Sequence, residues 1–253
     1  MVVHIFGKLL YHLLVSMNSK GKYIGLNQRI PFDVLDSSIH YYLANGIVDR
    51  SIIFQYMQEF TSGINRASKA TGYVIQILSR QENLLVQLKK QLKETPYNNL
   101  KIADRKAFCL CLISLTYPIT YDLLVALAQG FKVQDQINKK FISEKVMSIY
   151  GSNRTVDVAI DALLPMIIEL KTIKRDKVSL YSKATALGVI NKYISELVIF
   201  TDIKLSGSKS ILIDDLSFRP WYSYFDISAI NPEHFNQLIS KKDSAVGKGY
   251  LTI

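Results

Sequence analysis

The residues that could carry out catalysis are few and scattered along the chain. The four histidines, His4, His12, His40 and His234, have neither metal-ligand spacing nor a glutamate partner. The sequence also lacks a glycine-rich phosphate loop, a nucleophile-elbow serine and a paired-cysteine zinc pattern. We therefore expect a non-enzymatic protein with no catalytic residue, cofactor or metal ion.

One arrangement of acidic residues is compatible with a metal-dependent nuclease. Asp202 and Lys204 lie in a segment that we predict to be one strand of a hairpin, and Asp214-Asp215 follows the other strand. Carboxylates on neighbouring strands could hold Mg²⁺, which prefers oxygen ligands. No Glu-x-Lys partner accompanies them, so a nuclease ranks behind the two hypotheses developed below.

The two cysteines indicate a reducing compartment. Cys109 and Cys111 lie two residues apart in an apolar run, where a helix points them to different faces. This is typical of buried structural thiols rather than of a disulfide framework or a metal site. We expect a cytoplasmic protein.

The charge of the chain favours a polyanionic partner. Lys and Arg number 31 against 21 Asp and Glu, which gives a formal net charge of +10. The surplus is equal in residues 1–100 and in residues 101–253. A distributed positive field suits nucleic acid or an anionic membrane surface.

A membrane span is not expected. Residues 107–128 are apolar, but Pro118 and Asp122 interrupt them, and an ionised Asp near mid-bilayer costs roughly 3 kcal/mol. We predict two buried helices that meet at Pro118. Residues 1–16 lack the clean apolar stretch and cleavage site of a signal peptide.

Composition divides the chain into four parts. We predict an N-terminal extension (1–30, with Met17 as an alternative start), a helical unit (31–96), a second helical unit (101–183) and a C-terminal part (184–253). The polar residues 97–100, which follow Pro96, are the predicted linker between the helical units.

The first helical unit has the layout of a helix-turn-helix. A helix from Pro31 ends at Asn45-Gly46, Asp49 caps the next helix, and a third helix spans Arg66 to Ser79. A plain three-helix bundle with solvated charges explains the pattern equally well. If the unit binds DNA, its candidate contacts are Arg66, Lys69 and Thr71.

The second unit is predicted to contain a winged helix between Phe141 and Ser182. A helix ends at Gly151, and Ser152 or Asn153 caps a longer amphipathic helix. An extended run over 167–173, a basic turn over 174–177 and a strand over 178–182 follow and would form the wing.

Such a unit would place the start of its second helix in the major groove and its wing along the phosphate backbone. Arg154 could pair with guanine or phosphate, and Asn153 could cap the helix or read adenine. Asp157 and Asp161 lie on the same helix and repel phosphate, which favours backbone contacts over base readout. The candidate contacts are Ser152, Asn153, Arg154, Thr155, Lys171, Lys174, Arg175 and Lys177.

The C-terminal part is predicted to hold a helix over 187–198 and a small β-hairpin, with strands over 200–205 and 210–213 around Gly207-Ser208. The aromatic segment 218–225 either caps the core or contacts a partner. The basic and glycine-rich end after Lys241 is predicted to be flexible.

Several segments together resemble BrxA, the small helical component of bacteriophage-exclusion (BREX) defence systems. The resemblance covers about 34–175 and rests on loosely spaced residues: Tyr42–Gly46, Arg66–Thr71, Leu115–Pro118, Asp122–Leu124 and Ser152–Arg175. It implies a non-enzymatic DNA-binding protein with helix-turn-helix elements, whose partners are DNA and other defence proteins.

The sequence thus predicts a mainly α fold with two helix-turn-helix-type units, the second a winged helix, and a small C-terminal β-hairpin. Our first hypothesis for its function is an accessory protein that binds duplex DNA in a BREX-type system. The alternative is a scaffold that holds a protein partner through the wing and the aromatic segment without binding DNA.

Overall fold

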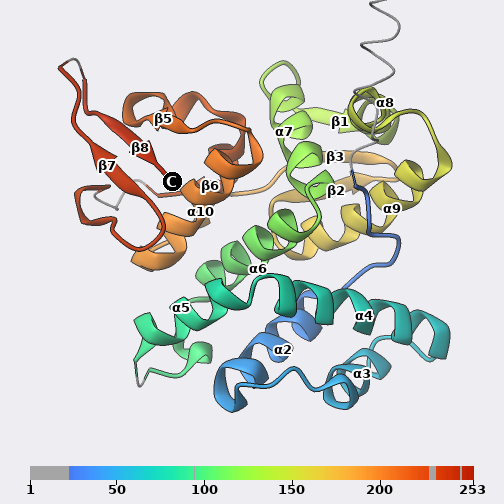
Figure 1. The fold of residues 1–253 in the computed structure, drawn as a ribbon. Helices are drawn as coiled ribbons and strands as arrows, with labels where there is room; N and C mark the ends of the chain where they lie inside the picture. The colour runs from blue at the N-terminus through green and yellow to red at the C-terminus, as the bar shows by residue number, and fades with distance from the viewer. Residues whose placement is uncertain (1–22, 94, 228–231, 246) are drawn as a thin grey trace, which may run out of the picture.

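The computed structural model describes residues 23–253 except 94, 228–231 and 246 (Figure 1). This part of the chain is mainly helical, with short strands in its second half. Residues 1–22, which include most of the predicted extension and Met17, lie outside the described residues. Leu26 and Ile30, assigned to the same extension, are buried in the core.

The N-terminal unit consists of α2 (Phe32–Asn45), α3 (Arg50–Gln58), α4 (Ile64–Arg80) and α5 (Glu82–Leu92). The predicted end of α2 and the predicted start of α3 are confirmed. Gly46 follows α2 at φ 74°, a left-handed conformation that glycine adopts without strain. Asp49 caps α3 by accepting the backbone N–H groups of Ser51 (2.8 Å) and Ile52 (3.2 Å).

The predicted linker contributes to the core. Tyr97 opens the 3₁₀ turn η1 (Tyr97–Asn99) and is buried, with its hydroxyl donating to Asp36 at 2.9 Å. Arg105 forms an ion pair with the same carboxylate. Tyr97 thus belongs to the core, in contrast to the rest of the predicted polar linker, because its ring packs between α2 and Phe108.

Two helices at the centre of the molecule meet at Pro118, as predicted. They are α6 (Ile102–Thr116) and α7 (Ile119–Phe131), and they are bent by 115° relative to each other. Within the described residues, no single helix is long and apolar enough to cross a membrane, and α6 and α7 reach that size only when taken together.

Five elements follow α7: β1 (Gln136–Asn138), α8 (Lys139–Tyr150), α9 (Arg154–Glu169), β2 (Ile173–Lys177) and β3 (Leu180–Lys183). The strands form an antiparallel sheet of order β1-β3-β2. The sequence patterns did not predict β1. α7 packs against α8, and α8 packs against α9, so the three helices lie beside the small sheet.

Two boundaries in this region differ from the prediction. α9 continues through Glu169, because Ile167 extends the buried face begun by Ile160 and Leu163. Lys174–Lys177, predicted as a turn, forms β2, because its backbone pairs with β3 and Arg175 lies opposite the buried Tyr181. The turn is at Val178-Ser179, where Ser179 has φ 59°.

The predicted C-terminal hairpin is wrong in its first strand and in its pairing, whereas its second strand, predicted over 210–213, is confirmed as β5. α10 (Lys192–Leu205) runs through its proposed first strand, since Val198, Thr201 and Asp202 continue a buried helical face. β5 (Ser210–Leu212) pairs with β8 (Tyr250–Thr252), and β8 pairs with β7 (Ser240–Lys242). The end predicted to be flexible therefore forms an antiparallel sheet of order β5-β8-β7.

Short elements connect α10 to this sheet. The 3₁₀ turns η2 (Ile213–Phe218), η3 (Pro220–Tyr224) and η4 (Pro232–His234) alternate with extended chain, and β4 (Leu187–Gly188) pairs in parallel with β6 (Phe225–Asp226). Trp221, Tyr224 and Phe225 are buried, so most of the aromatic segment belongs to the core.

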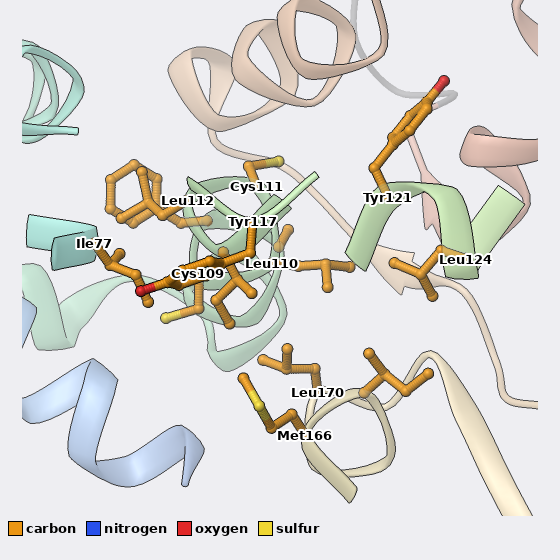
Figure 2. Close-up of a cluster of buried hydrophobic side chains, with 14 of the residues drawn as sticks. Ile77, Cys109, Leu110, Cys111, Leu112, Tyr117, Tyr121, Leu124, Met166 and Leu170 are labelled. Carbon is orange, nitrogen blue, oxygen red and sulfur yellow. The ribbon is translucent and has the colours of Figure 1, made fainter. Parts of the chain in front are cut away.

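A single apolar core extends from Leu26 to Leu251. Figure 2 shows its central part, where Cys109 of α6 and Tyr117 lie near Ile77 of α4, and Met166 and Leu170 approach from the end of α9. This packing attaches α9 and the sheet beside it to the N-terminal unit through α6.

Candidate nucleic-acid interface

The start of α9 is exposed and carries four of the predicted contacts. Gly151 precedes it at φ 85° and ψ 152°, a backbone conformation that favours glycine. The side-chain oxygen of Asn153 accepts the backbone N–H of Val156 at 3.2 Å, so the predicted cap is formed by Asn153. Ser152, Asn153, Arg154 and Thr155 are all exposed.

The two carboxylates of α9 have different surroundings. Asp157 is half-buried, whereas Asp161 is exposed and forms an ion pair with Lys139, the first residue of α8. The backbone N–H of Lys139 also donates to Ser179 at 2.9 Å. Lys139 therefore offsets one of the charges that would repel phosphate and joins the β2–β3 turn to the side of α9.

Positive charge is concentrated in residues 171–183, which we call the basic hairpin. It contains five basic residues and one acidic residue. β2 is an edge strand, and every residue from Lys174 to Lys177 is exposed. Among the described residues, no carboxylate forms an ion pair with Lys171, Lys174, Arg175, Lys177 or Arg154.

The single acidic residue of the basic hairpin is held within the sheet. Asp176 accepts hydrogen bonds from the side-chain amide of Gln136 and the hydroxyl of Ser182, both at 3.0 Å. These neutral donors from β1 and β3 occupy both carboxylate oxygens, so Asp176 pairs with none of the neighbouring cations. The basic side chains of β2 remain available to an external anion.

The positive field extends from the basic hairpin toward α6. Lys171 has φ 61° and is exposed, and its charge lies close to that of Lys106. Burial lowers the pKa of Lys106, and the charge of Lys171 lowers it further. The Lys106 ammonium lies 5.2 Å from the centre of the Phe32 ring.

Of the three DNA contacts predicted in the N-terminal unit, two are exposed and the third is wrong. Arg66 and Lys69 are exposed in the first turns of α4. Thr71 is 0% exposed and therefore cannot contact DNA. The predicted apolar stripe of this helix began at Val74, but the buried face already begins at Ala67 and includes Thr71.

Three basic residues near these positions were missed. Lys183 lies one residue beyond the predicted strand, and continuing the strand pattern by that residue would have included it. Lys139, the first residue of α8, lies two residues before the predicted winged-helix unit, which begins at Phe141. Arg29 pairs with Glu169 across 140 residues of sequence, and no local pattern reveals such a contact.

The arrangement considered for a nuclease is not formed. Asp202 lies inside α10, where it accepts a hydrogen bond from the Tyr121 hydroxyl at 2.6 Å and pairs with Arg219. Asp214 and Asp215 belong to η2, so the carboxylates are not on neighbouring strands. The described residues contain no group of three or more His, Cys, Asp or Glu that could hold a metal ion.

The remaining reactive groups are either buried or isolated. Cys109 and Cys111 are free thiols in the core, and burial raises the pKa of Cys111 to about 12. His40 is exposed, whereas His4 and His12 lie outside the described residues.

Comparison with protein-family models, with curated proteins and with solved structures finds no match to this chain.

Proposed function

We propose that the chain is a non-enzymatic DNA-binding protein that uses α7 through β3 as a winged helix. The order helix, strand, helix, helix, strand, strand supports this proposal. The observation that carries it is the exposed edge strand β2, whose cations have no carboxylate partner among the described residues. Phosphate is the anion that such a strand would bind in duplex DNA.

The proposed docking places the start of α9 in the major groove, with the basic hairpin along the backbone. Arg154 is free to bind phosphate or guanine, since no acidic side chain pairs with it among the described residues. Asp157 remains on the same helix without a cation partner in that set. We therefore propose binding dominated by phosphate contacts, with little discrimination between sequences.

The resemblance to the BrxA family extends this proposal to a biological setting. In that setting the chain would be a cytoplasmic accessory protein of a BREX-type defence system, with duplex DNA and other defence proteins as its partners. Arg66 and Lys69, exposed on α4, would then provide further DNA contacts from the N-terminal helix-turn-helix.

Replacing Arg154 and Lys174 together with alanine should weaken binding to duplex DNA about tenfold or more. Each side chain is expected to neutralise one phosphate, so the slope of log affinity against log salt should fall by about 0.9 per residue. Fluorescence anisotropy with a labelled duplex over a salt series measures both quantities.

The matched control is Lys209→Ala, because Lys209 is exposed beyond α10 and far along the chain from the basic hairpin. We expect this control to bind as the wild type does. Unchanged affinity and slope in the Arg154→Ala, Lys174→Ala variant would exclude the proposed docking face.

A protein-binding scaffold is the second candidate, and one observation favours it. Val178, at the turn of the basic hairpin, is 81% exposed. An apolar side chain at this tip suits a protein surface better than a phosphate backbone. A partner that co-purifies in a fixed ratio and is lost on Val178→Asp, with no duplex binding at low salt, would support this candidate over DNA binding.

A further inference from the structure

A hollow of about 250 Å³ lies between the chain that precedes α2 and the turn between α3 and α4. Met57 and Phe60 form part of its apolar lining. The polar side chains that line it are Gln28, Arg29, Thr61 and Arg66.

All four polar side chains can donate hydrogen bonds, and none of the described residues that line the hollow has a carboxylate. The hydroxyl oxygen of Thr61 accepts the backbone N–H of Gly63 at 3.3 Å, which leaves the hydroxyl hydrogen available. A guanidinium group has five N–H donors in a planar fork that matches phosphate oxygens. Two such groups beside an amide and a hydroxyl favour an anion with several oxygen atoms.

Arg29 pairs with Glu169, but some of its N–H donors remain unused by this ion pair. Its guanidinium donates to Glu169, which accounts for one of its N–H groups. Arg66 has no carboxylate partner among the described residues. The pair therefore retains a net positive charge next to the hollow even with Glu169 ionised.

We propose that this hollow binds a backbone phosphate of the same duplex that the basic hairpin and α9 contact. This inference rests on the proposed function and adds a second, separate contact to it. Gln28, Arg29 and Thr61 thereby acquire a role that their sequence neighbourhoods did not suggest.

Glu169 fixes the position of the hollow relative to α9. It is the last residue of α9, and its carboxylate binds Arg29 and also accepts the backbone N–H of Phe32 at 3.0 Å. Phe32 begins α2, where Pro31 provides no side-chain cap, so Glu169 caps that helix from another part of the chain. The contacts of Glu169 with Arg29 and Phe32 thus join the hollow to the proposed winged helix.

The arrangement of the elements allows one duplex to reach both places. α4 and α9 both begin at the right-hand side of Figure 1, and the chain that leads into α2 passes between them. Arg66 lies in the first turn of α4, and Arg154 is the first residue of α9. The two helix starts that carry Arg66 and Arg154 therefore lie toward the same side of the molecule in this view.

The test compares Arg29→Gln with Glu169→Gln, because both changes break the same ion pair and only the first removes a cation from the hollow. For Arg29→Gln we expect duplex affinity at low salt to fall about three- to tenfold and the salt slope to fall by about 0.9. Glu169→Gln should leave affinity unchanged or raise it, since it removes a negative charge. Equal losses in both variants would overturn the proposal and assign Arg29 a purely structural role.

Arg66→Gln provides an independent measurement if Arg29→Gln fails to fold. It should weaken binding in the same way, while Lys90→Gln, on the exposed face of α5, should not. Suppose that Arg66→Gln binds as the wild type does, while the double variant Arg154→Ala, Lys174→Ala loses affinity. The proposed phosphate site in the hollow is then overturned, and the winged-helix proposal stands. If the wild type does not bind duplex at low salt, both proposals are overturned.

Discussion

Replacing Asp202 with alanine should lower the free energy of unfolding by about 3 kcal/mol. Asp202 is 1% exposed and joins Tyr121 of α7 to Arg219, which precedes η3. Its loss leaves the guanidinium of Arg219 without its counter-charge and the Tyr121 hydroxyl without its acceptor. We place the effect at the low end of the range for broken buried pairs because Arg219 is partly exposed. Urea denaturation followed by circular dichroism measures it.

Asp215→Ala is the control for this substitution. Asp215 is an exposed carboxylate of η2 in the same part of the chain, and its removal should change the stability by less than about 0.5 kcal/mol. Equal stabilities of the two variants would contradict the structural role assigned to Asp202. The contacts with Tyr121 and Arg219 already occupy both oxygens of the Asp202 carboxylate.

Replacing Trp221 with alanine should lower the free energy of unfolding by about 3–5 kcal/mol, the usual range for deleting a buried tryptophan. The side chain is 0% exposed, and its ring lies 5.2 Å from that of Tyr121 and 5.0 Å from that of Phe225, between centroids. Its indole N–H donates to the backbone oxygen of Val198 at 3.0 Å. The substitution therefore creates a cavity between α7, α10 and η3 and removes the hydrogen bond that the indole donates to that oxygen.

Differential scanning calorimetry and urea denaturation measure this effect. Phe218→Ala is the matched control, because Phe218 belongs to the same aromatic segment but is 74% exposed. It should change the stability by about 0.5 kcal/mol or less. A Trp221→Ala protein as stable as this control would show that the aromatic segment is not part of the core.

The helices could be predicted from the sequence wherever a local signal sets a boundary. Asp49 caps α3, Gly46 ends α2, and Pro118 separates α6 from α7. Each of these signals acts within a few residues of the boundary that it sets, so a single sequence contains it. The two buried helices α6 and α7 were predicted for the same reason.

The strands were harder to predict because they are short and pair with distant parts of the chain. β5 looked like one strand of a local hairpin, yet its partner is β8, about 40 residues later. β1 has only three residues, and its register depends on Tyr181 of β3. Thr201 and Asp202 resembled part of a strand by residue type, but their burial belongs to the helical face of α10.

In the candidate site, too, features set by local signals could be predicted, and features set by distant contacts could not. The exposed start of α9 could be predicted because Gly151 and Asn153 define it locally. Lys174, Arg175 and Lys177 of the basic hairpin were identified, although they lie on a strand instead of at a turn. Arg29 and its contact with Glu169 could not be predicted, because the pairing depends on how the whole chain folds.

The most direct test is a salt titration of wild-type protein on a labelled duplex. Four cations, Arg154, Lys174, Arg175 and Lys177, are exposed at the proposed docking face. Each neutralised phosphate contributes about 0.9 to the salt slope, so we expect a slope of about −3 to −5, with affinity lost as salt rises. Absence of binding at low salt, or a slope near zero, would contradict DNA binding by this protein.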